Sequence, residues 1–210
     1  MGTFREESEE RIIHRLEAFS DIVIGFSLAQ MTLNLVLPAD VLDLFTKQYV
    51  SLLAFGLTFG IVSGMWWSHH RVFTHYFVPT PLNIVLNFMS LGGVMFLVYS
   101  LQVFLHATVH QRVAYVMYTG AVAWVIGILA FLIYRGMVLR GHRMNEQLLI
   151  RGRRRVKRAV IIAVMFAAIA ALNATLPGDK DAQGYVVLAF LVLLAALRYF
   201  DSRRAVQRTS

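Results

Sequence analysis

The chain has 210 residues, of which 58% are hydrophobic and 15% are charged, and its mean hydropathy is +0.61. Soluble domains carry about 25% charged residues, so this composition indicates lipid as the surrounding solvent and leaves no visible soluble domain. The net charge of +8 does not point to nucleic acid, because the basic residues lie between and after the apolar runs. The absence of cysteine excludes disulfides and thiolate-bound metals. The first residues lack the apolar stretch of a signal peptide, so we expect the first helix to stay in the mature protein.

Six runs of the sequence are long and apolar enough to cross a membrane as helices, which takes about 20 residues each. They cover residues 16–37, 48–67, 82–105, 113–134, 159–176 and 184–200. Helix-breaking prolines lie in three of the gaps, at Pro38, at Pro79-Thr80-Pro81 and at Pro177-Gly178. The sequence therefore predicts an all-α membrane protein with six transmembrane helices per chain.

The Lys and Arg residues predict the orientation of the chain, because cytoplasmic loops are enriched in positive charge. With six helices and both termini cytoplasmic, all but three of the 20 Lys and Arg residues lie on the inner side; the exceptions are Lys47, Arg112 and Lys180. The predicted divisions are a cytoplasmic N-terminal segment 1–15, a six-helix transmembrane domain 16–200 and a basic cytoplasmic tail 201–210. The basic loop 151–158, RGRRRVKR, is predicted to contact anionic lipid.

The first apolar run carries more polar residues at membrane depth than the others do. At about 100° per residue, four of them fall within an arc of roughly 80°: Ser20, Ser27, Gln30 and Asn34. Beside this arc lie Phe19, Phe26 and Leu33. Polar side chains in a membrane helix usually face a water path or a bundle interior, so this face is a candidate permeation face. The alternative is that these residues join helices, as the small pair Gly25 and Ala29 also would.

Asp21 projects roughly 150° from the middle of that arc, into the protein. A buried carboxylate is costly in a membrane and needs a partner at the same depth. Candidate donors stand near the predicted inner ends of the second and third helices: Trp66, His69, His70, Asn83 and Asn87. We expect Asp21 to join some of them in a hydrogen-bond network that fixes the packing of the first three helices. The alternative is that they are unrelated interfacial side chains reaching toward lipid headgroups.

Three short motifs in the first three helices resemble a known family. They are Arg15-xxx-Phe19-Ser20-Asp21, Trp66-xx-His69-His70-xx-Phe73 and Leu86-Asn87. In this order they are similar to the signature of the lysosomal potassium channel family (transmembrane protein 175), and the prokaryotic members with a single six-helix repeat are the nearest likeness. The resemblance places the chain in the cell membrane of a prokaryote as a multi-pass protein.

The resemblance implies a passive, potassium-preferring cation channel, assembled as a homotetramer without a TVGYG filter. It implies a pore lined by the first helix of each subunit, with the gate and lining at Phe26, Gln30 and Leu33 and a secondary pore face at Ser27 and Asn34. Neither an enzyme activity nor a cofactor or bound metal follows from it, and the ions it implies are permeant potassium and other monovalent cations.

Three positions depart from the family pattern. Phe26 stands where isoleucine is usual, Gln30 where leucine is usual and Ala29 where threonine is common. A bulky aromatic ring would close the pore more firmly, and a ring of amides would coordinate ions.

Other functions compete with the channel interpretation. A membrane metalloenzyme is suggested by two groups of histidines, His69, His70 and His75 in one and His106 and His110 in the other. Their predicted positions at opposite membrane faces argue against one shared site. A secondary transporter also lines its path with polar helix faces, although no broken helix or inverted repeat is visible. A purely structural membrane protein remains open if the polar arc serves packing alone.

Overall fold

The computed structural model describes residues 2–33, 40, 42, 48–106 and 110–175. They form five long helices: α1 (Gly2–Leu33), α3 (Tyr49–His75), α4 (Pro81–His106), α5 (Gln111–Arg140) and α6 (Glu146–Thr175). A single 3-10 turn, Gly141–Arg143, joins the last two. The predicted sixth helix 184–200, the tail 201–210 and Asn34 lie outside the described residues.

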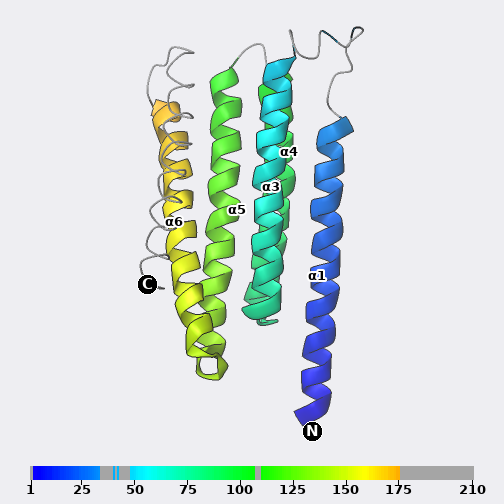
Figure 1. Ribbon diagram of the computed structural model, residues 1–210, viewed down its shortest axis with the longest axis vertical. Helices are drawn as coiled ribbons and strands as arrows, with labels where there is room; N and C mark the ends of the chain where they lie inside the picture. Colours follow the sequence, from blue (N-terminus) through cyan, green and yellow to red (C-terminus); the bar gives the residue numbers. More distant parts are fainter. Residues whose placement is uncertain (1, 34–39, 41, 43–47, 107–109, 176–210) are drawn as a thin grey trace, which may run out of the picture.

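The five helices stand side by side and run in alternating directions (Figure 1). The start of α1, the end of α3, the start of α4, the end of α5 and the start of α6 therefore share one end of the bundle, called the N-terminal end below. α5 packs against α4 and α6, while α1 packs against α3 and α4. By length and composition, each of the five is able to cross a membrane. The prediction of an all-helical protein with several helices able to cross a membrane is confirmed.

Two helices extend well beyond the apolar runs that revealed them. α1 begins at Gly2 and continues through the predicted boundary at residue 15, and α6 begins at Glu146. The prediction of a basic loop at 151–158 is therefore wrong, because this stretch is helical. Arg and Lys are good helix formers, so a helix can continue past the membrane-spanning part that hydropathy detects.

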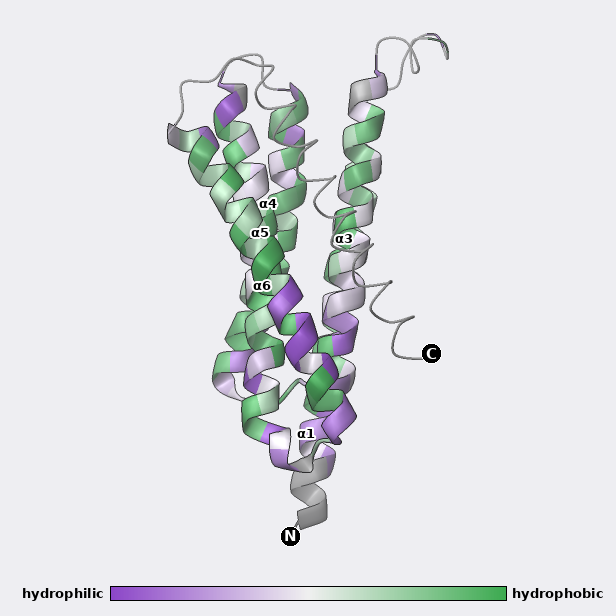
Figure 2. Ribbon diagram, turned by 60° about the vertical axis from the view of Figure 1, so that its left-hand side comes forward, coloured by the Kyte–Doolittle hydropathy of each residue, from purple (hydrophilic) through white to green (hydrophobic). Residues whose placement is uncertain are grey.

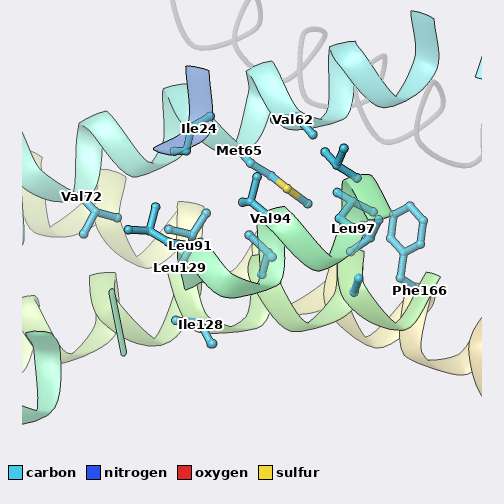
Figure 3. Close-up of a cluster of buried hydrophobic side chains, with 14 of the residues drawn as sticks. Ile24, Val62, Met65, Val72, Leu91, Val94, Leu97, Ile128, Leu129 and Phe166 are labelled. Atoms are coloured by element: carbon cyan, nitrogen blue, oxygen red, sulfur yellow. The ribbon is translucent and has the colours of Figure 1, made fainter. Parts of the chain in front are cut away.

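Apolar side chains from all five helices meet in one core. Their packing is the van der Waals contact that holds membrane helices together, since lipid offers no hydrophobic driving force between them. Figure 3 draws part of this core and labels Ile24, Val62, Met65, Val72, Leu91, Val94, Leu97, Ile128, Leu129 and Phe166.

At the N-terminal end, Tyr76, which follows α3, packs against α5 and α6. Its side chain is buried, and its hydroxyl donates to the carbonyl oxygen of Leu148 at 3.3 Å. A side chain at Gly136 would overlap the Tyr76 carbonyl, and a Cβ at Gly152 would lie 3.1 Å from the Tyr76 ring. Glycine is needed at Gly136 because only it lets the two backbones approach this closely.

Candidate pore helix

α1 has one side that packs on the protomer and one side that does not. Ser20, Ile24 and Ser27 lie on the packed side and are buried, with exposed fractions of 0%, 2% and 4%. On the opposite side, the exposed fraction is 60% for Phe26 and 78% for Leu33. α3 and α4 thus cover one face of α1 and leave the other open.

The predicted polar arc is split between these two sides. Ser20 and Ser27 face the protomer, and their hydroxyls donate to the carbonyl oxygens of Leu16 and Val23 in the preceding turn, at 2.7 and 2.8 Å. In the single chain, Ser27 therefore does not lie on the uncovered side of α1. Serine can satisfy its hydroxyl within its own helix, so its polarity does not show which way it points. Gln30, between the two sides, is half-buried.

A buried chain of hydrogen bonds joins α3, α4 and α1. The His69 Nε2 lies 2.7 Å from the Asn87 Oδ1, and the Asn87 amide nitrogen donates to the Ser20 hydroxyl at 3.2 Å. All three side chains are buried. Because the Asn87 oxygen can only accept, His69 Nε2 carries the hydrogen and Nδ1 is left as an acceptor, for which the described protein atoms supply no partner.

Asp21 lies in a separate contact between α1 and α3. The Trp66 indole nitrogen donates to the Asp21 carboxylate at 2.8 Å, in a groove that Gly25 and Ser63 also line. This is one of the hydrogen bonds expected for Asp21. The Asp21 side chain is half-exposed in the single chain and is bonded to α3, which packs on α1.

His70 and Asn83 take partners that the sequence reasoning missed. His70 Nδ1 lies 3.0 Å from a Glu17 carboxylate oxygen, and the Asn83 oxygen accepts from Arg135 at 2.7 Å. Glu17 stands four residues before Asp21 on the same helix, so the helical period alone could have placed it beside the same donors. Arg135 directly follows the fourth apolar run, and Asn83 lies near the start of the third, so alignment of the two helices would have placed the residues at a similar depth.

Aromatic contacts surround these hydrogen bonds. The rings of Phe19 and Phe88 of α4 meet edge to face with their centroids 5.8 Å apart, and the His69 ring stacks on that of Phe73 with the centroids 4.8 Å apart. Arg15, the first residue of the signature, lies on the exposed charged surface of α1. Phe19, Ser20 and Asp21 of the signature thus contact α3 or α4 directly, whereas Arg15 does not.

The two histidine groups lie at opposite ends of the bundle. His69, His70 and His75 belong to the end of α3, whereas His106 closes α4 at the other end and bonds the Gln102 carbonyl of its own helix at 2.9 Å. Within the described part of the chain, no three His, Cys, Asp or Glu side chains lie close enough together to hold a metal ion.

The sequence matches the family described as "Endosomal/lysosomal potassium channel TMEM175" over residues 15–98. The family resemblance is confirmed. This match covers α1 from Arg15 onward, α3 and most of α4, which are the helices joined by the hydrogen bonds described above. No curated protein matches the sequence.

Two solved structures share the fold. One is a lysosomal potassium-selective channel TMEM175 homolog from Chamaesiphon minutus, with a TM-score of 0.65, 21% identity and coverage of 88% of this chain and 98% of that chain. The other is a single-substitution variant of the potassium channel MtTMEM175 in complex with a nanobody fusion protein, with a TM-score of 0.62, 17% identity and coverage of 90% of this chain and 93% of that chain. At this level of identity the likeness is one of fold.

Proposed function

We propose that the chain is a potassium-preferring cation channel that conducts passively through a pore lined by α1 of each subunit. The main support for this proposal is that the side of α1 with Phe26 and Leu33 is uncovered, in a fold shared with TMEM175 channels. Such a channel is not an enzyme and needs no cofactor. Its proposed partners are monovalent cations, anionic lipid and further copies of itself in a homotetramer, in the cell membrane of a prokaryote.

In this proposal, Phe26 and Leu33 from the copies form the narrow part of the path. Their rings and isobutyl groups would meet around a shared axis, and partly dehydrated cations would pass between them. The Gln30 amide, at the edge of the same side, would replace part of the hydration shell. Ser27 has no place in this mechanism, since it is buried within the protomer.

Glycines on the outer side of α3 support assembly from several copies. Gly56, Gly60 and Gly64 follow one another at intervals of four residues, and an added Cβ at any of them would meet no atom within 4 Å in the single chain. Glycine inside a helix costs about 1 kcal/mol relative to alanine. In membrane helices this spacing allows close approach of a second helix, which the described part of the protomer does not supply.

A secondary transporter is the strongest competing function. Transporters place their substrate at helices that are broken in mid-membrane. Each of the five described helices runs without interruption between its ends. A channel needs no such break, so the described helices favour conduction over alternating access.

Reversal potentials measured with purified protein in a planar bilayer test the proposal. With potassium on one side and sodium on the other, a potassium-preferring channel gives a passive current whose reversal potential is negative on the potassium side. Saturable uptake driven by an ion gradient, without such a current, would establish a transporter instead. Protein that folds and assembles but carries neither flux would leave only a structural role.

A further inference from the structure

The basic stretch near the start of α6 is sorted by the helix into a packed side and an exposed side. Gly152 is buried, and a Cβ there would lie 3.1 Å from the ring of Tyr76. Arg153, Arg154 and Lys157 are exposed. At about 100° per residue, these three side chains fall within an arc of roughly 100°, called the basic face of α6 below. The basic face exists only because this stretch is helical.

The basic face has no acidic partner among the described residues. The ion pairs found there join Glu17 to His70 and Glu9 to Arg140, and the side chains of the basic face take part in neither of them. None of the three side chains forms a hydrogen bond within the described part of the chain. Like charges at spacings of three and four residues on a helix repel one another. An anion beside the basic face is therefore favoured.

The same side of α6 continues as an exposed apolar surface. Each residue of the basic face is followed, seven positions later, by an exposed apolar residue: Val160, Ile161 and Val164. Their exposed fractions are 46%, 38% and 61%. Seven residues make about two helical turns, so each apolar side chain lies about 10 Å along the helix from a basic one on the same side. Figure 2 shows strongly hydrophilic residues gathered toward the N-terminal end, beyond a mostly hydrophobic band.

The depth of the basic face indicates a lipid rather than a free anion. The apolar part of α6 begins directly after Arg158. At a rise of about 1.5 Å per residue, the basic face lies within about 8 Å of this boundary. The headgroup layer on each side of a bilayer is about 5–8 Å thick, so the basic face lies at headgroup depth when the apolar part spans the hydrocarbon. A ligand that fits both parts of this side has an anionic head and an apolar tail.

We propose that an anionic phospholipid lies along this side of α6, with its phosphate at the basic face and an acyl chain against Val160, Ile161 and Val164. The guanidinium groups of Arg153 and Arg154 suit the phosphate oxygens, and the Lys157 ammonium adds a further positive charge. This site deepens the lipid contact included in the proposed function and rests on that membrane placement, but on no step of conduction.

Native mass spectrometry of protein purified with phosphatidylglycerol and phosphatidylcholine tests the site. The variant Arg153→Gln/Arg154→Gln/Lys157→Gln should retain phosphatidylglycerol about tenfold less than the parent chain. The matched control Arg203→Gln/Arg204→Gln/Arg208→Gln removes three charges from the C-terminal tail and should retain this lipid nearly unchanged. Equal loss in both variants, or no loss in either, would overturn the site. Arg153→Lys/Arg154→Lys keeps every charge, so it should retain more of the lipid than the glutamine variant does.

Two further measurements locate the lipid and separate it from a free anion. Phosphatidylglycerol with a photoactivatable group on its acyl chain should crosslink to Val160, Ile161 or Val164, and crosslinks confined to other helices would contradict the proposal. An excess of glycerol phosphate should not displace the lipid, since the acyl chains contribute to binding; full displacement would identify a free-anion site instead. Ion flux is measured separately: conduction without lipid retention would refute only this site, and lipid retention without conduction would refute only the channel.

Discussion

At the scale of single residues, the sides that polar and apolar residues of α1 face are the reverse of what their polarity suggests. Its serines face the protomer and bond to their own helix, whereas Phe26 and Leu33 face outward. Of the gate and lining positions implied by the resemblance, Phe26 and Leu33 therefore lie on the open side of α1, and Gln30 lies at the edge of that side. A polar side chain in a membrane seeks a partner, and its own preceding turn is the nearest one.

Replacing Phe26 with alanine should raise ion flux in liposomes, because the aromatic ring is then missing from the narrow part of the proposed path. A barrier lowered by about 1.4 kcal/mol gives about a tenfold increase. Phe131→Ala on α5 removes an equally large, exposed ring away from α1 and should leave the flux unchanged. If flux through the Phe26 variant equals that of the parent, Phe26 is not the gate.

Replacing Asn87 with leucine should destabilise the packing of the first three described helices. The change leaves the buried His69 nitrogen without its acceptor, at a cost of about 1–3 kcal/mol. Thermal unfolding in detergent measures this loss. Ser100→Ala is a suitable control, because the buried Ser100 hydroxyl bonds only the Phe96 carbonyl of its own helix. Equal melting of the Asn87 variant and the parent would show that the network does not stabilise the fold.

At the scale of helices, hydropathy located the apolar segments well but not their ends. Residues 2–15 and 146–158 belong to continuous helices although they are rich in charge. A window of apolar residues measures the fit to a bilayer, whereas helix length depends on backbone propensity and on packing beyond the bilayer. The three outward glycines of α3, in contrast, are fully visible in the sequence, but only the structure shows that nothing covers them.

Introducing leucine at Gly60 should prevent close packing between copies and lower the fraction of oligomer. The added side chain meets nothing within the protomer, so the fold of the single chain should survive. Gly92→Leu on α4 is a control, because that position is also open to its surroundings. Size-exclusion chromatography with light scattering gives the oligomeric state of both. An intact oligomer with Gly60→Leu would place the subunit contact elsewhere.

At the scale of the whole molecule, the alternation of helix direction brings most basic segments to one end of the bundle. The predicted sixth helix would bring the C-terminal tail to that end as well. Charge asymmetry across a membrane follows from the local sequence of each connection, so it could be predicted without knowing how the helices pack.

Single cysteines test this topology cleanly, because the natural chain has none. Cysteine at Ser8 or Ser202 should be protected from a membrane-impermeant maleimide in intact cells, since the predicted six helices would place both termini in the cytoplasm. Cysteine at Asp40 should react, because one helix separates it from the N-terminus. Labelling of Ser202→Cys together with protection of Ser8→Cys would mean an odd number of spanning helices.

The sequence by itself determined the membrane environment, the described spanning helices, the asymmetry of charge and the family resemblance, because each depends on residues close together in the chain. Only the tertiary structure decided which side of α1 is covered, that Asp21 meets Trp66 rather than the histidines, and that Asn83 binds Arg135. Those pairings depend on the rotation and relative depth of separate helices, and the period of one helix contains neither.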